Sequence, residues 1–268
     1  MFKRIFSYNV NGLRSAINKG FDIWLRESGP DILCLQELKA KPEQIDTMLF
    51  DRLGYRQYWH SAQKPGYSGV AIFCKTKPDK VVYGMGIDKY DVEGRLIRAD
   101  FGDITVISVY FPSGTSGGER QAFKMQFLDD FLCWIEKLRV ERPNLIISGD
   151  YNIAHTDIDI NFPKKHTRMS GFLPEERTWV DKFLGHGYVD TFRMLNSQPN
   201  VYSWWSYRQQ ARTKDLGWRI DYNIATEALI PRIKEASIMQ SAIHSDHCPV
   251  TVTVEVEDSV QQLPNPVF

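Results

Sequence analysis

Short apolar runs that end in polar residues recur along this chain and predict most of its strands. Residues 2–10 alternate in character and stop at Asn11-Gly12, which is typical of a strand that enters a turn. Residues 31–37 form a buried run with a carboxylate, Glu37, at its C-terminal end. Other β-branched or aromatic runs predict strands at residues 69–75, 96–101, 104–110, 144–148, 219–225, 232–238 and 249–256.

Amphipathic segments between these runs predict helices at residues 15–28, 42–53, 119–141 and 174–186. Gly29-Pro30 closes the first helix, and Pro42 opens the second. The third carries one apolar stripe, formed by Phe123, Phe127, Phe131, Ile135 and Leu138. Along the final strand, the valines at every second position from Val250 to Val256 predict one buried face.

Strands and helices interleave without a regular β-α-β repeat, and no linker or low-complexity segment divides the chain. We therefore predict one α/β domain over residues 1–256, with two packed sheets covered by helices. Residues 257–268 are polar and contain proline, so we expect a frayed C-terminal tail.

Composition narrows the class of protein only slightly. The chain has 268 residues, of which 43% are hydrophobic and 25% charged, as in ordinary globular proteins. Lys plus Arg equals Asp plus Glu at 33 each, so net charge neither indicates nor excludes nucleic acid. The cysteines form no C-x-x-C pair, which disfavours a zinc cluster and fits a reducing, cytoplasmic location. The sequence also predicts no signal peptide and no membrane span.

Polar residues that can bind metals stand at or near the ends of the apolar runs. They are Asn9, Asn11, Glu37, Tyr110, Asp150, Asn152, Asp221, Asp246 and His247. Taken singly, each is more simply a turn former, and His247 could be a satisfied core histidine. The whole series is harder to explain in that way. Carboxylate and amide oxygens with a single histidine and no thiolate suit Mg²⁺ or Mn²⁺ better than zinc.

Short motifs around these residues follow one another from about residue 3 to residue 254. They are Asn9-Val-Asn-Gly-Leu-Arg14, Leu35-Gln-Glu37, Gly66-Tyr-Ser-Gly-Val70, Val109-Tyr-Phe-Pro112, Gly149-Asp-Tyr-Asn-Ile153, Gly171-Phe-Leu-Pro-Glu-Glu-Arg177, Val189-Asp-Thr-Phe-Arg193, Gly217-Trp-Arg-Ile-Asp-Tyr222 and Ser245-Asp-His-Cys-Pro249. In this order they resemble the exonuclease III family of apurinic/apyrimidinic (AP) endonucleases, within the exonuclease–endonuclease–phosphatase superfamily. The resemblance implies a four-layer α/β/β/α sandwich, two mixed sheets flanked by helices, with the site at one edge.

The resemblance also implies roles for the polar series. Glu37 would be the principal Mg²⁺ ligand, with Asn9 and Asp246 near it. Asp150 and Asn152 would handle the attacking water and the scissile phosphate, with a second metal site as one option.

A histidine and a tyrosine would complete the hydrolytic centre. His247, oriented by Asp221, would contact the phosphate, and Tyr110 would contact the same phosphate or help the leaving group. Hydrolysis of a phosphodiester needs a cation to neutralise charge and a base to activate water. The sequence leaves open whether Asp150 or His247 is that base.

Specificity would come from a second set of residues. The resemblance places Trp204, Trp218 and Ile220 in an apolar pocket for an extruded baseless sugar, with Ser170 at its mouth. Arg208 would wedge into the duplex, and the neighbouring tryptophan at position 205 is expected in the core. Basic residues flank this segment and would meet phosphates: Lys164, Lys165, Arg168, Arg208, Arg212, Lys214 and Arg219.

One departure concerns the acidity of the site. Asn11, which we place with the substrate-binding residues, stands where some relatives carry aspartate, which lowers the negative charge next to the metal.

The resemblance implies a monomeric DNA-repair phosphodiesterase. It would cut double-stranded DNA 5′ to abasic sites, with secondary 3′→5′ exonuclease and 3′-end-cleaning activity. Mg²⁺ would be the cofactor, and Mn²⁺ could replace it. The alternatives are a phosphoesterase of the same superfamily acting on inositol phosphates or sphingomyelin, and a catalytically inactive nucleic-acid-binding protein.

Overall fold

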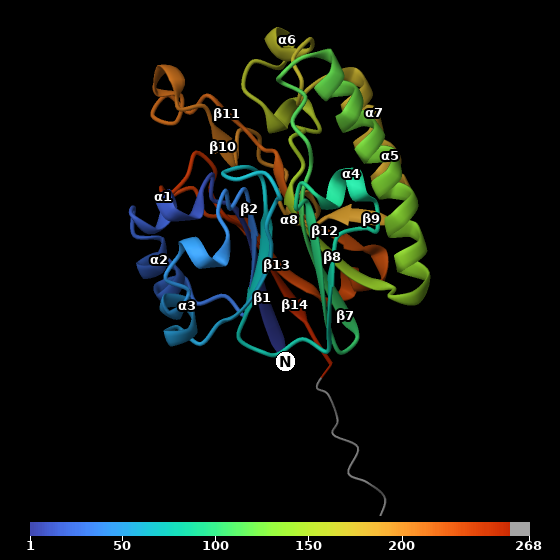
Figure 1. The fold of residues 1–268 in the computed structure, drawn as a ribbon. Coiled ribbons are helices and arrows are strands. Elements are labelled where there is room, and N and C mark those ends of the chain that lie inside the picture. Colours follow the sequence, from blue (N-terminus) through green and yellow to red (C-terminus); the bar gives the residue numbers. More distant parts are fainter. Residues whose placement is uncertain (258–268) are drawn as a thin grey trace, which may run out of the picture.

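Two six-stranded mixed sheets stack face to face, and helices cover both outer faces, which confirms the predicted four-layer sandwich (Figure 1). The computed structural model describes residues 1–257, so the predicted tail, apart from Glu257, lies outside the described residues. No helix within the described range is long and apolar enough to cross a membrane.

The first sheet has the strand order β13-β14-β1-β2-β4-β3. Its strands are β1 (Phe2–Asn9), β2 (Ile32–Gln36), β3 (Arg56–His60), β4 (Val70–Cys74), β13 (Ile233–Ile238) and β14 (Val250–Glu255). Its outer face packs against α1 (Leu13–Ile17), α2 (Phe21–Ser28) and α3 (Met48–Arg52). The valines of β14 have the predicted period, because Val250, Val252 and Val254 are buried.

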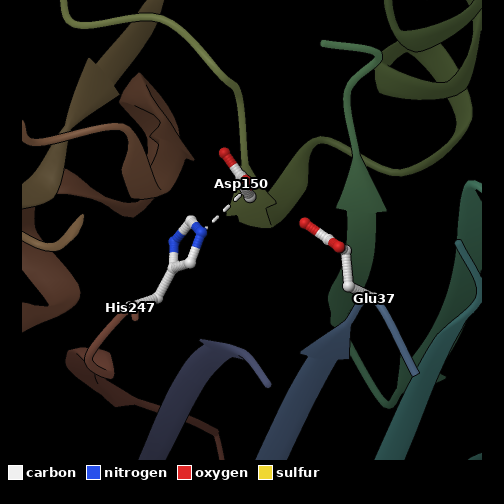
Figure 2. Close-up of side chains that lie close together, drawn as sticks. All are labelled: Glu37, Asp150 and His247. Carbon is white, nitrogen blue, oxygen red and sulfur yellow. Dashed lines mark ion pairs between the residues drawn. The ribbon is translucent and has the colours of Figure 1, made fainter. Parts of the chain in front are cut away.

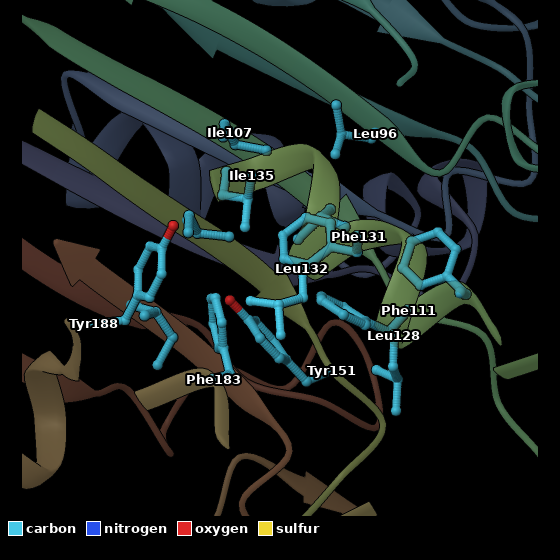
Figure 3. Packing of buried hydrophobic residues seen from close by; sticks show 14 of the residues in the cluster. Leu96, Ile107, Phe111, Leu128, Phe131, Leu132, Ile135, Tyr151, Phe183 and Tyr188 are labelled. Atoms are coloured by element: carbon cyan, nitrogen blue, oxygen red, sulfur yellow. The ribbon is translucent and has the colours of Figure 1, made fainter. Parts of the chain in front are cut away.

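The second sheet has the order β5-β6-β7-β8-β12-β9. Its strands are β5 (Lys80–Tyr83), β6 (Leu96–Phe101), β7 (Ile104–Tyr110), β8 (Asn144–Asp150), β9 (Tyr188–Asp190) and β12 (Asp221–Thr226). Its outer face packs against α5 (Gly118–Glu141) and α7 (Pro174–Gly185) through a core rich in aromatic rings (Figure 3). Phe127, Phe131, Ile135 and Leu138 of the predicted α5 stripe are buried there.

Shorter elements connect the layers. A small sheet, β10 (Trp204–Trp205) with β11 (Gly217–Trp218), stands beyond one edge of the sandwich near α6 (Pro163–His166) (Figure 1). The remaining short helices are α4 (Asp88–Asp91), α8 (Thr191–Leu195), η1 (Pro42–Gln44), η2 (Asp157–Asp159), η3 (Arg208–Gln210) and η4 (Glu227–Arg232).

Two of the predicted helices are interrupted. The helix expected at 15–28 is broken at Gly20, whose left-handed φ of 86° separates α1 from α2. The helix expected at 42–53 is a 3₁₀ turn and a separate α3, because Ile45 is extended with φ −134°. The patterns also did not predict the edge strands β3 and β5, whose side chains are largely half-buried or exposed. Such edges lack the continuous apolar run of a strand buried on both faces.

In each sheet the two central strands run parallel: β1 with β2, and β7 with β8. Their C-terminal ends therefore lie side by side, with Asn9 opposite Gln36 and Tyr110 opposite Asp150. The antiparallel β12 begins at the same level, because Asp221 pairs with Asp150. Stacking the sheets brings these strand ends to one edge of the sandwich.

Candidate active site

Side chains from both sheets meet at this edge. Glu37 directly follows β2, Asp150 ends β8, and His247 precedes β14. One potential ligand atom from each of these three residues lies within 4.8 Å of the other two (Figure 2). The topology thus gathers residues that are far apart in sequence into a group that could hold a metal ion.

The backbone is strained where the strands end. Asn11, Glu37 and Asn152 have φ values of 46°, 51° and 52°, in the left-handed region. Such a conformation costs roughly 1–3 kcal/mol for a non-glycine residue and persists only where the surroundings enforce it. At Glu37, the carbonyl accepts a hydrogen bond of 2.7 Å from the amide of Gly12. The strain turns these side chains out of the strand direction and into the edge.

Asn9 links the two sheets. Its Nδ2 donates to Glu37 Oε1 at 2.8 Å and to Asp150 Oδ2 at 2.9 Å, and its Oδ1 accepts from the Asn11 amide at 2.9 Å. Asn9 is fully buried. In this orientation the amide aligns two carboxylates, while its predicted role as a metal ligand stays a prediction.

Asp221 orients His247. The imidazole Nδ1 lies 2.8 Å from Asp221 Oδ2, and the same oxygen accepts from Ser203 Oγ at 2.6 Å. Since a carboxylate can only accept here, Nδ1 carries the proton. The other ring nitrogen, Nε2, lies 3.9 Å from Asp150 Oδ2. The bond to Asp221 therefore fixes the orientation of the ring and turns Nε2 into the site.

Excess negative charge sets the protonation of this centre. Burial, together with the nearby Asp221 and Glu37 carboxylates, raises the pKa of Asp150 to about 8. Burial alone would lower the pKa of His247, but Asp221, Asp150 and Asp246 raise it to about 10. At neutral pH the imidazole is thus held as a cation, and Asp150 is a far stronger base than an ordinary carboxylate.

The acids at the rim are held by other partners. Burial opposes ionisation of Glu37, but the Lys39 ammonium, 2.8 Å away, and the amide of Asn9 keep its pKa below the usual range. Asp246 accepts from Asn11 Nδ2 at 2.9 Å and from the Trp204 indole at 3.1 Å. These bonds and the nearby imidazole lower the pKa of Asp246 despite its burial.

Tyr110 and Asn152 complete the edge. Burial, then the Glu37 and Asp150 carboxylates, raise the pKa of Tyr110 well above its ordinary value, so its hydroxyl stays a donor. Asn152 donates its Nδ2 to the Phe111 carbonyl at 3.0 Å and its backbone amide to Asp150 Oδ1 at 2.8 Å.

The sequence reasoning missed two cations. Lys39 bonds both Glu37 and Asn11, and Arg95, almost fully buried, has its guanidinium 5.0 Å from the Tyr110 ring centroid. Lys39 stands two positions after Glu37, a signal that was available. Arg95 stands alone after Gly94, and its sequence neighbourhood offers no comparable signal.

An apolar cluster lies beside the charged group. Trp204, Trp218 and Ile220 pack together as predicted, with Ala154, Ile160 and Phe172. The two indole rings are 5.9 Å apart and nearly perpendicular. The Trp204–Asp246 hydrogen bond joins this cluster to the charged centre. The tryptophan at position 205 is buried in a separate cluster, so its predicted place in the core is confirmed.

The other predicted substrate contacts are placed unevenly. Ser170 lies next to Gly171, where an added Cβ would come within 2.8 Å of the Trp218 ring. Its hydroxyl donates to Gln121 Oε1 at 2.8 Å. Arg208 is exposed on η3.

The prediction that Arg219 meets phosphates is wrong. Its side chain is fully buried and pairs with Asp159 and Asp190, both at 2.7 Å. The remaining members of the basic set are exposed or half-buried.

Residues 6–247 match the model of the endonuclease/exonuclease/phosphatase family. The exodeoxyribonuclease of Bacillus subtilis is 41% identical over 94% of this chain and 100% of its own length. The DNA repair nuclease APEX1 of Danio rerio is 39% identical over 94% of this chain and 82% of its own length. The structure of an AP endonuclease from Archaeoglobus fulgidus superposes with a TM-score of 0.87 at 32% identity, covering 95% of this chain and 100% of that one.

The family match, the relatives named exodeoxyribonuclease and DNA repair nuclease, and the fold shared with an AP endonuclease identify a hydrolytic nuclease. The chain belongs to the endonuclease/exonuclease/phosphatase family.

Proposed function

We propose that this nuclease hydrolyses the DNA backbone 5′ to abasic sites and removes nucleotides or blocking groups from 3′ ends as a secondary activity. One observation carries the proposal: the Trp204 indole bonds Asp246, which joins the charged centre to the apolar cluster. A hydrolytic centre next to an apolar surface suits a phosphate whose neighbouring sugar has lost its base. The names of the relatives, exodeoxyribonuclease and AP endonuclease, support both activities.

Mg²⁺ is the cofactor that fits the donors best, and Mn²⁺ fits the same set. Glu37 would be the principal ligand, with Asn9, Asp246 and the Asp150–Asn152 pair close to it. The raised pKa of Asp150 reports unbalanced negative charge, which a divalent cation would relieve. When bound, such a cation neutralises charge on the phosphate and on the leaving oxygen.

Asp150 is the better candidate for the general base. Burial and the neighbouring carboxylates raise its pKa, so the ionised carboxylate is a stronger base than an ordinary aspartate, and a bound cation would favour that ionised form near neutral pH. His247 is a cation at that pH and is bound to Asp221, so it suits neither proton abstraction nor metal ligation. This holds although one of its ring nitrogens lies within 4.8 Å of a carboxylate oxygen of Glu37. It would instead donate Nε2–H to a phosphate oxygen.

The remaining polar residues would orient the substrate. Asn152 would hold the attacking water or a phosphate oxygen, and Tyr110 would donate its hydroxyl to the phosphate or the leaving oxygen. Asn11 would contact the same strand of DNA. Trp204, Trp218 and Ile220 would enclose the extruded sugar, and the exposed Arg208 would fill the gap in the duplex.

The decisive experiment is incision of a duplex oligonucleotide with one internal abasic site, in Mg²⁺ and in EDTA. We expect a single cut that leaves a 3′ hydroxyl, and only with metal. An intact abasic duplex with rapid release of phosphate from inositol phosphates or sphingomyelin would favour the phosphoesterase alternative. Tight DNA binding without any cleavage would favour the inactive binding protein.

Selection between the two DNA reactions is tested at Ser170. Ser170→His replaces a small side chain next to Gly171 by a bulky ring, which should narrow the proposed entrance, so incision at the abasic site should fall far more than processing of a recessed 3′ end. Initial rates on both substrates measure this. Equal loss on both would mean that Ser170 does not control entry of the abasic sugar.

We also propose that the enzyme acts as a monomer on double-stranded DNA in the cytoplasm.

A further inference from the structure

A fully buried ion pair connects α5 and α7, outside the predicted site. Lys124 Nζ lies 2.5 Å from Glu176 Oε1, and both side chains have 0% exposure. These two helices run together along the outer face of the second sheet (Figure 1). Removing two charges from water costs several kcal/mol per ion, and an apolar pair of similar volume is often as stable. Stability alone is therefore a weak reason for this pair.

Lys124 reaches the edge of the sandwich where Glu37, Asp150 and His247 meet, which we call the hydrolytic edge. Its ammonium donates to the backbone carbonyl of Asn152 at 2.8 Å. Asn152 has the strained φ of 52°, and its side-chain nitrogen donates a hydrogen bond to the Phe111 carbonyl. The same amide nitrogen also lies 3.4 Å from Asp150 Oδ2, which places the Asn152 side chain beside the acids of the site. Lys124 thus holds the backbone at the residue whose side chain would orient the water or phosphate.

Glu176 holds the other side of the same region. Its Oε2 accepts from the backbone amides of Gly171 at 2.6 Å and Leu173 at 2.9 Å, and its Oε1 accepts from Ser170 Oγ at 3.1 Å. A Cβ on Gly171 would come within 2.8 Å of the Trp218 ring and 3.2 Å of the Asn152 carbonyl oxygen. The loop at residues 170–173 therefore packs tightly between Trp218 of the apolar cluster and the backbone of Asn152 at the hydrolytic edge.

We propose that Lys124 and Glu176 are positioning residues that lock the Asn152 backbone to the loop at residues 170–173. The pair sets the distance between the hydrolytic edge and the apolar cluster, so that a sugar held by the cluster presents its phosphate to the edge. This inference rests on the role proposed for Asn152. A misplacement of about 1 Å at such a site costs on the order of 100-fold in rate.

The test replaces the pair by neutral side chains of similar size, Lys124→Met with Glu176→Gln, in the full chain. Turnover on the abasic duplex should fall by about 100-fold. The dissociation constant for the same duplex, measured in EDTA, should stay within about twofold, because Asn152 acts on the reaction more than on binding. The matched control is Arg98→Met with Asp100→Asn, another buried pair, on β6 at 2.6 Å. It should change the melting temperature but not turnover.

A mutant cycle separates positioning from general softening of the fold. In an Asn152→Ala background the Lys124–Glu176 replacement should lower turnover by less than about twofold, because both changes remove one function. A full additional loss in that background would overturn the proposal, as would unchanged turnover in the wild-type background. If the methionine variant does not fold, Lys124→Gln with Glu176→Gln keeps a polar pair that is too short to reach Asn152, and the same outcomes apply. A wild-type protein without incision would instead refute the proposed function.

Discussion

Two buried charged clusters lie in the same part of the molecule and differ in their balance of charge. At the hydrolytic edge, Asp150 and Asp221 stand next to one imidazole, that of His247. Behind the apolar cluster, Asp159 and Asp190 face the guanidinium groups of Arg219 and Arg193. The first cluster has more acidic groups than basic ones, and in the second the two carboxylates are matched by two guanidinium groups.

The difference appears in the ionisation of two buried aspartates. Asp150, beside other carboxylates, has its pKa raised to about 8. Asp159 is also buried, but Arg219 and Arg193 lower its pKa far below the ordinary value. Burial opposes the charged form in both, so the neighbouring charge decides the direction.

The comparison separates a chemical role from a structural one. An unmatched carboxylate is a base and a site for a cation, and it weakens the fold. A carboxylate that is already paired with a guanidinium has no free capacity for a cation. Here it supports the apolar cluster, because its partner Arg219 lies between Trp218 and Ile220 in the chain.

The largest effect is expected from Asp150→Asn and His247→Asn. Each should lower turnover on the abasic duplex by several orders of magnitude, on the order of 10³-fold or more. The reason is that the proposed base, Asp150, and the proposed phosphate contact, His247, act on the same transition state. Single-turnover rates measure this, and DNA binding should survive. The combined variant should be little worse than either alone. Fully additive losses would mean that the two residues serve separate steps.

Glu37→Gln tests the metal side of the acid-rich cluster. The amide keeps the shape but removes the charge, so activity should drop by about 100-fold or more at limiting Mg²⁺ and recover partly when Mg²⁺ is raised. The measurement is a Mg²⁺ titration of the initial incision rate, with Glu43→Gln, at an exposed position on η1, as the control. A normal titration curve would remove Glu37 from the ligand set.

Asp159→Asn tests the matched cluster. Breaking a buried pair leaves uncompensated guanidinium groups, so the free energy of unfolding at pH 7 should fall by about 3–5 kcal/mol. Because the folded-state pKa of Asp159 is lowered, its stabilisation is present above the unfolded value near 3.9 and is lost as pH falls below it. Urea unfolding at pH 7 and pH 3 should therefore show a gap between wild type and variant that narrows in acid. A gap that widens in acid would contradict the assignment.

The smallest effect sharpens the contrast. In EDTA at pH 9, above the raised pKa of Asp150, Asp150→Asn should raise the melting temperature by a few degrees, because it removes one ionised member of a repelling group of acids. Thermal unfolding of this variant beside Asp159→Asn gives the comparison directly. Destabilisation by both variants would mean that the hydrolytic edge is matched in charge as well.

Much of the fold was predictable from local patterns. The strands predicted at residues 96–101 and 104–110 have the bounds of β6 and β7, and the helix predicted at 119–141 is α5 within one residue. Patterns failed where the local signal was weak or misleading. Left-handed Gly20 separates α1 from α2 although the apolar spacing continues beyond it, and β3 is a sheet edge that is only half-buried.

The sequence by itself determined which side chains stand at the strand ends, because Glu37, Asp150 and His247 each border an apolar run that must form a strand. Only the tertiary structure decided what those side chains and their supports do. Lys124 can be buried because its ammonium forms an ion pair with Glu176, 52 positions away, and donates a hydrogen bond to the Asn152 carbonyl. Arg219 is a structural cation for the same reason: it pairs with Asp159, 60 positions away. Charge compensation depends on distance in space, and a linear pattern carries no information on which distant partner closes each pair.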